Sequence, residues 1–375
     1  MPVTAKGLEG IVANSTSISD VQGAEGRLIY AGYDINELAG KVTYEEVVYL
    51  LWHGLLPNRK QLDELTQSLR SNRELPKEVT NFLLTAPKTA GPMDVIRTAV
   101  SMLGLYDPAK ADDQSPEQNR LRATDITAKI GVIAAYFHRA RQGKDLPPIR
   151  QDLGEAAHFL YLMTGEAPSQ EAIDTLDVAF VLHADHGMNA STFSARVTIA
   201  TLSDMYSAIT SAIGTLKGPL HGGANEGVIH MLVEIGSEDN VDAWVENALA
   251  QKKKIMGIGH RVYKVLDPRA PHLREMGIKL SQQLGEPKWI RMSERIAAIM
   301  KERKGLNANV DFYSATVYYS LGIPTDLFTP VFAIARTSGW TAHVLEQLVD
   351  NRLYRPLSEY VGPAVGKKVV PINER

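Results

Sequence analysis

Three polar side chains stand beside glycine- or asparagine-rich turns and could together move protons. His221 lies within the segment GPLHGG (218–223). His260 lies within GIGHR (257–261), and Asp311 follows an Asn-rich turn at the start of an apolar helix. Glycine lets a substrate approach the backbone closely, and turns expose side chains that a helix interior would bury. A carboxylate with two imidazoles suits a reaction that takes a proton from carbon and gives one to oxygen.

Each of the three side chains also has a simpler interpretation. His221 precedes a helix start, where the dipole disfavours the charged imidazole, so a neutral ring could donate a hydrogen bond to an enolate. It could equally be a structural histidine bonded to the backbone of its turn. Asp311 could be an ordinary helix N-cap. His260 stands near Arg261, Lys264 and Arg269, which indicates either an anion site with a proton donor or a solvated basic loop.

Two glycines before His260 suggest a dinucleotide-binding loop, but the third glycine and the strand–turn–helix context are missing. His183 and His186 have a spacing that could hold a metal, but no third ligand at a suitable spacing follows them. We therefore expect no metal site, with His186 contacting an anion or carbonyl and His183 packing. Arg336 follows an apolar run and requires an anionic partner, for which a carboxylate is the best match.

The composition is that of an ordinary globular protein of 375 residues, with 44% hydrophobic and 22% charged residues. A net charge of -3 argues against nucleic-acid binding, and no apolar run is long enough to span a membrane. There is no cysteine, which excludes disulfides, thiolate zinc sites and a cysteine nucleophile. The absence of cysteine is compatible with the cytosol, and we expect a cytoplasmic protein.

Helical periodicity dominates the chain after residue 34 and predicts an all-α protein with a small β ornament. Before it, residues 11–13, 17–19 and 27–30 are predicted to form short extended pieces of hairpins. Helices are expected near residues 43–54, 58–71, 77–84, 93–103, 124–141, 153–163, 170–182, 192–202, 204–216, 224–235, 241–253, 271–284, 288–303, 312–321, 326–335 and 340–349.

Two glycine-rich breaks, near Gly222 and Gly322, predict the domain organisation. A chain of this length favours two domains. We expect a large domain from residues 1–222 and 322–375, and an inserted small domain from residues 223–321. Closure about such joints would exclude water from a reactive intermediate.

Four segments together resemble the citrate synthase family, and the resemblance spans nearly the whole chain. They are HADH (183–186), GPLHGGAN (218–225), GIGHRVYK with DPR (257–264 and 267–269) and NVDF (309–312). The resemblance implies a mostly helical homodimer of the short type whose two domains close on substrate. It also implies oxaloacetate and acetyl-CoA as substrates, with no metal or other cofactor.

The resemblance implies a role for each matching residue. Asp311 would remove a methyl proton from acetyl-CoA, His221 would stabilise the resulting enol or enolate, and His260 would protonate the oxaloacetate carbonyl. The residues implied to hold oxaloacetate or citrate are His186, Arg269, Phe332, Arg336 and, reaching in from the other subunit, Arg355. Those implied to hold the coenzyme are Lys254, Ile255, Met256, Gly257, Ile258, Gly259, Lys264 and Asn309.

Other functions compete with this one. A 2-methylcitrate synthase would run the same chemistry on propionyl-CoA, and one methylene allows discrimination of only ~1–3 kcal/mol. A non-catalytic helical binding protein of the same fold need not keep His221, His260 and Asp311 together. A metal hydrolase lacks a ligand set in this sequence. We expect a citrate synthase, with the 2-methylcitrate reaction as the alternative.

Overall fold

The computed structural model describes residues 5–109 and 113–375, and helices predominate in them. The strands are β1 (Ser19–Gln22), β2 (Arg27–Tyr30) and β3 (Tyr33–Asp34). The first α-helices are α1 (Ile35–Leu38), α2 (Tyr44–His53), α3 (Arg59–Ser71), α4 (Lys77–Thr85), α5 (Pro92–Leu103), α6 (Pro116–Arg141), α7 (Glu155–Thr164) and α8 (Gln170–His183). The others are α9 (Ala190–Ile199), α10 (Met205–Leu216), α11 (Ala224–Ile235), α12 (Val241–Ala250), α13 (Ala270–Leu284), α14 (Lys288–Lys304), α15 (Val310–Ser320) and α16 (Phe328–Val349). The prediction of an all-α fold with a small N-terminal β element is confirmed.

The β element is a single antiparallel sheet in the order β1-β2-β3. Residues 27–30 form β2 as predicted, with Leu28 and Tyr30 buried. The prediction of a strand at residues 11–13 is wrong. Ile11 and Val12 are exposed there and have no partner strand among the described residues. The first strand instead begins at Ser19, where pairing with Tyr30 starts.

Local capping sets the helix starts that the sequence indicated. Thr43 and Glu46 form a reciprocal capping box at the start of α2, and Gly54 ends that helix in the left-handed conformation at φ 76°. α6 begins at Pro116 and not near residue 124, because the Ser115 side chain caps the helix and proline fits its first turn.

The last two predicted helices, 326–335 and 340–349, are one continuous helix, α16. Gly339 lies inside it and does not break it. Its N–H donates to the carbonyl of Ala184 at 3.1 Å, and a Cβ there would lie 2.4 Å from that oxygen. The glycine therefore allows close approach between α16 and the segment after α8.

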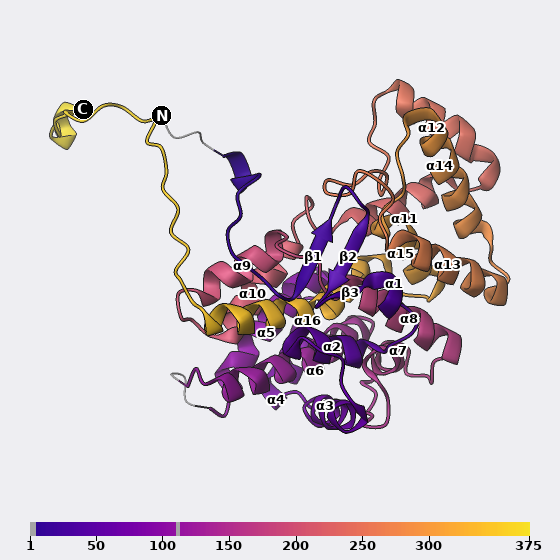
Figure 1. The fold of residues 1–375 in the computed structure, drawn as a ribbon, viewed down its shortest axis with the longest axis horizontal. Helices are drawn as coiled ribbons and strands as arrows, with labels where there is room; N and C mark the ends of the chain where they lie inside the picture. Colours follow the sequence, from indigo (N-terminus) through magenta and orange to yellow (C-terminus); the bar gives the residue numbers. More distant parts are fainter. Residues whose placement is uncertain (1–4, 110–112) are drawn as a thin grey trace.

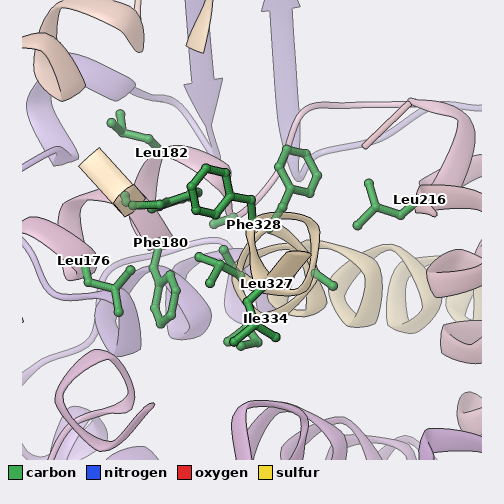
Figure 2. Close-up of a cluster of buried hydrophobic side chains, with 14 of the residues drawn as sticks. Leu176, Phe180, Leu182, Leu216, Leu327, Phe328 and Ile334 are labelled. Carbon is green, nitrogen blue, oxygen red and sulfur yellow. The ribbon is translucent and has the colours of Figure 1, made fainter. Parts of the chain in front are cut away.

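Helix α16 is at the centre of the hydrophobic core and packs against α2, α6, α8, α9 and α10. Figure 2 shows this packing near its start, where Leu176 and Phe180 of α8 lie beside Phe328 and Ile334 of α16. The helix is buried over most of its length, including Trp340. Side chains on α16 are therefore held in a rigid setting.

Helices α11 to α15 gather at one end of the molecule in Figure 1 and pack against one another. The β1–β2 turn contacts the loop after His260, where the N–H of Lys264 donates to the carbonyl of Gly23 at 2.9 Å. After α16 the chain leaves the body as an extended tail (Figure 1). No helix in the described residues is both long enough and apolar enough to cross a membrane.

Candidate active site

One cavity of about 770 Å³ brings together side chains from distant parts of the chain. It is lined by residues from the turn after α8, the loop before α11, the loop before α13, the start of α15 and the middle of α16. Its lining includes seven residues singled out in the sequence: His186, His221, His260, Arg269, Asp311, Phe332 and Arg336. The three candidate proton-transfer groups therefore share one cavity.

His221 lies in the turn between α10 and α11. Gly222 permits that turn, because a Cβ there would lie 2.4 Å from the carbonyl oxygen of Leu216. The backbone N–H of Ser191, at the start of α9, donates to His221 Nε2 at 3.3 Å. The Ser191 hydroxyl lies 2.8 Å from the same nitrogen and can either donate or accept. Because a backbone N–H can only donate, we assign the ring proton to Nδ1. Burial, with Arg336 nearby, lowers the pKa of His221 to about 4 and keeps it neutral.

His260 is held by the other ring nitrogen. The backbone N–H groups of Val262 and Tyr263 donate to its Nδ1 at 3.0 and 3.1 Å. Its ring proton is therefore on Nε2. Burial, together with Arg269, lowers the pKa of His260 to about 4. His260 is thus a neutral imidazole that can donate from Nε2, whereas His221 can donate from Nδ1.

Asp311 lies in the first turn of α15. The N-cap is Asn309, whose side chain accepts from the N–H groups of Asp311 and Phe312. The alternative reading of Asp311 as a simple N-cap is therefore wrong. Burial raises the pKa of the Asp311 carboxyl to about 6, against the opposing effect of Arg269. A carboxylate with such a pKa is a stronger base than a solvated aspartate and is still ionised near neutral pH.

Two buried guanidinium groups give the cavity a positive wall. Arg269 forms a two-point ion pair with Asp267, with N···O distances of 3.0 and 2.9 Å. Asp267 Oδ2 also accepts the N–H of Val310 at 3.1 Å, so the same carboxylate ties Arg269 to the helix that carries Asp311. The Nε of Arg336 donates to the carbonyl of His183 at 2.7 Å. Two such groups suit a ligand with two carboxylates.

His186 and His260 are linked by Tyr263, which is not among the predicted site residues. Tyr263 Oη lies 3.1 Å from His186 Nε2, and its ring centroid lies 4.7 Å from that of His260. Phe332 lies under Arg336, with the guanidinium carbon 4.7 Å from the ring centroid. Tyr263 and Asp267 fall inside the family segments, but only their contacts across the loop indicate what they do.

Comparison with known proteins shows the family of the chain. Residues 7–357 match the family described as "Citrate synthase, C-terminal domain". The chain belongs to the citrate synthase family. It is 51% identical to "Citrate synthase 2" of Bacillus subtilis over 99% of both chains. It is 42% identical to "2-methylcitrate synthase 1" of Corynebacterium glutamicum over 99% of this chain and 98% of that one.

A solved citrate synthase from Thermoplasma acidophilum has the same fold. It is a ternary complex with carboxymethyl coenzyme A and oxaloacetate. The two structures align with a TM-score of 0.92 at 32% identity, and the alignment covers 100% of both chains. Membership of the citrate synthase family, inferred from the four segments, is therefore confirmed.

The segment implied to bind the coenzyme lies beside the cavity and does not line it. It pairs with the chain just before Asp311. Ile258 bridges to Ala308, and the N–H of Asn309 donates to the carbonyl of Gly257 at 2.9 Å. Gly257 has φ 73°, and a Cβ there would lie 2.7 Å from Val228 Cγ2. Lys254 and Lys264 are exposed, and Ile255 is buried.

Arg355 is also absent from the cavity lining. It is exposed in the tail that follows α16, beside the N-terminal segment that includes Ala13 and Ser17. In the described residues, no cluster of three or more His, Cys, Asp or Glu side chains is arranged to hold a metal ion.

Proposed function

We propose that this member of the citrate synthase family condenses acetyl-CoA with oxaloacetate and water to give citrate and CoA. The observation that carries the proposal is the meeting of Asp311, a base with a raised pKa, with two neutral histidines in a cavity walled by buried arginines. A thioester methyl is a very weak carbon acid. A base therefore needs a donor already in place at the oxygen where charge develops.

In the first step the Asp311 carboxylate takes a proton from the acetyl methyl group. The Nδ1–H of His221 donates a hydrogen bond to the thioester oxygen and stabilises the enol or enolate. Because His221 is neutral, it stabilises the oxygen as a hydrogen-bond donor without being a strong acid.

In the second step the enol carbon attacks the ketone carbon of oxaloacetate. The Nε2–H of His260 polarises the ketone and passes its proton to the oxygen as the C–C bond forms. The methyl proton held by Asp311 then restores the proton of the His260 ring, so no imidazolate remains and the base is ionised again. Water then cleaves the thioester of the citryl-CoA intermediate and releases citrate and the CoA thiol. General acid and base assistance of this kind contributes roughly 10²–10⁴ in rate.

Oxaloacetate is assigned to the positive wall of the cavity. Arg269 and Arg336 would bind its carboxylates, His186 would contact its carbonyl side, and Phe332 would cover it. Arg355 would come from a second copy of the chain, which is supported by its exposed position in a tail that leaves the body (Figure 1). We therefore assign a homodimer.

The coenzyme is assigned to Lys254, Lys264, Asn309 and the loop 255–259. Glycines in that loop would let the coenzyme approach the backbone, and the exposed lysines suit its phosphates. The small domain, residues 223–321, would carry this loop and Asp311. Its closure against the large domain, residues 1–222 and 322–375, would exclude water until the C–C bond has formed.

A thiol-release assay with oxaloacetate and each acyl-CoA in turn tests the proposal. We expect turnover with acetyl-CoA to exceed turnover with propionyl-CoA, in line with the higher identity to the relative named citrate synthase. Faster turnover with propionyl-CoA would assign the protein as a 2-methylcitrate synthase. Absence of thiol release with both substrates would reject the enzyme assignment.

A further inference from the structure

A second polar network surrounds the turn that carries His186. It consists of Asp185, His343, Arg196 and Glu346, none of which lines the cavity. Asp185 and His343 are 0% exposed, and Arg196 is 1% exposed. Burying charged and polar groups is unfavourable unless they are paired. Their contacts therefore indicate what the network holds in place.

Asp185 fixes the backbone on both sides of His186. Its Oδ2 accepts the N–H of Gly187 at 2.9 Å and a short hydrogen bond from the hydroxyl of Ser19. On the other side of His186, the Asp185 carbonyl accepts a hydrogen bond from Tyr30 Oη at 2.9 Å, and the Asp185 N–H donates to the same Oη at 3.1 Å. The two peptide groups that flank His186 are thus tied to one carboxylate and to the first two strands. This gives the small β element a role in shaping the cavity.

His343 presents a hydrogen-bond donor to the same carboxylate. Arg196 donates to His343 Nδ1 from Nη2 at 2.7 Å and from Nε at 3.1 Å. A guanidinium has no acceptor, so the proton of neutral His343 is on Nε2. This nitrogen lies 3.2 Å from Asp185 Oδ1, at an alignment too poor for a regular hydrogen bond, so the attraction is mainly electrostatic.

The far end of the network is also anchored. Arg196 forms a short ion pair with Glu346, and Glu346 Oε1 accepts the N–H of Ser17 at 2.8 Å. Burial alone would raise the pKa of Asp185, but the His343 ring N–H, the Arg336 guanidinium and the Ser19 hydroxyl lower it below its ordinary value. The carboxylate is therefore ionised at any pH at which the protein would work.

Helix α16 packs closely against the turn that carries His186. Gly339 brings the helix so close that a Cβ would lie 2.5 Å from Asp185 Oδ1. Arg336, three residues earlier, donates to the carbonyl of His183, and His343, four residues later, faces Asp185. One buried helix thus both lines the cavity with Arg336 and supports the turn that carries His186.

We propose that Asp185 and His343 are positioning residues that set His186 for oxaloacetate, with Arg196 and Glu346 holding His343. This inference rests on the proposed function of the cavity. It predicts a selective effect: loss of the network weakens the use of oxaloacetate, while acetyl-CoA is used nearly as before, because the coenzyme loop and Asp311 lie on other elements.

Two substitutions at one position test the inference. Gln at position 343 can accept from Arg196 through its amide oxygen and donate to Asp185 through its amide nitrogen, whereas Leu can do neither. We expect His343→Leu to raise the KM for oxaloacetate about tenfold or more, because it leaves the buried Asp185 carboxylate and Arg196 guanidinium facing an apolar side chain. The KM for acetyl-CoA should stay within about twofold, and His343→Gln should recover most of the loss.

If His343→Leu does not fold, Ser19→Ala is the second test variant. It removes the hydrogen bond from strand β1 to the Asp185 carboxylate and leaves every residue of α16 unchanged. It should raise the same KM by roughly two- to tenfold. The inference is overturned if either variant leaves the KM for oxaloacetate unchanged, if both KM values rise together, or if His343→Gln is as impaired as His343→Leu. An inactive wild-type protein would instead count against the proposed function.

Discussion

The loop that carries His221 and the loop that carries His260 hold the same side chain in opposite ways. In the first, a backbone N–H from the start of α9 donates to Nε2. In the second, two backbone N–H groups two and three residues further along the chain donate to Nδ1. Both rings are neutral with pKa values of about 4, so the two loops differ in where the donor N–H is and not in charge.

This difference shows how the surrounding backbone lets two histidines donate from different ring nitrogens. A backbone N–H cannot accept, so its direction fixes which ring nitrogen carries the proton. The His221 ring is fixed by a remote helix, whereas the His260 ring is fixed by its own loop. Since both rings serve as donors in the proposed reaction, the base must be a third group, and Asp311 is the carboxylate that lines the same cavity.

The largest effect is expected from Asp311→Asn, which removes the base and leaves both histidine loops intact. We expect kcat to fall by about 10²- to 10⁴-fold. Burial raises the pKa of the Asp311 carboxyl, so its charge is unfavourable in the fold and the amide should not lower the melting temperature. Steady-state kinetics and thermal unfolding of the two proteins check this. Near wild-type kcat would mean that one of the histidines is the base and that the comparison of the loops is wrong.

The pH dependence gives an intermediate effect that separates Asp311 from the histidines. The base must be ionised, so kcat/KM for acetyl-CoA should fall by about tenfold for each pH unit below about 6. His221 and His260 stay neutral down to about pH 4, so the slope between pH 6 and pH 4 should correspond to one proton. A slope of two would show that an imidazole titrates together with the carboxyl.

The same group affects stability with the opposite sign. The folded protein holds the Asp311 proton more tightly than the unfolded chain does. Its stabilising contribution is therefore present below about pH 4 and is lost as the pH rises to about 6. Urea unfolding of both proteins checks this. The free energy of unfolding of the wild type, relative to that of Asp311→Asn, should fall as the pH rises from about 4 to about 6.

Sequence patterns located the site because its residues carry local signals. Glycine beside His221 and His260 and the Asn-rich turn before Asp311 mark places where chain and ligand come close. The patterns failed where a contact comes from elsewhere in the chain. The separate helices predicted at residues 326–335 and 340–349 are one helix in the structure, and at Gly339, between them, the carbonyl of Ala184 approaches α16 closely.

Which ring nitrogen of each histidine carries the proton could not be predicted, for the same reason. Ser191 is 30 residues from His221, and Arg196 is 147 residues from His343. No spacing in the sequence indicates that such pairs meet. Residue types near a turn therefore predict that a group is functional, whereas its protonation depends on long-range packing that only the structure provides.

The smallest effect is expected from Ser191→Ala, and it tests the tautomer of His221 directly. The Ser191 hydroxyl lies 2.8 Å from His221 Nε2 and also contacts Trp340 Nε1 and Asn189 Oδ1. The backbone N–H of Ser191 remains in the variant and still donates to Nε2. We therefore expect kcat to fall only roughly two- to tenfold, the effect of one neutral hydrogen bond.

The opposite outcome has an equally clear physical meaning. If Nε2 carried the proton, the hydroxyl would be its acceptor, and the variant would leave a buried N–H unpaired and free the ring to change tautomer. The loss should then approach that of removing a donor to a developing oxyanion, about 10²- to 10³-fold. Measuring kcat for Ser191→Ala beside Ser191→Thr, which keeps the hydroxyl, separates the two cases. A large loss in the first and a small one in the second would place the His221 proton on Nε2 and make the two loops alike.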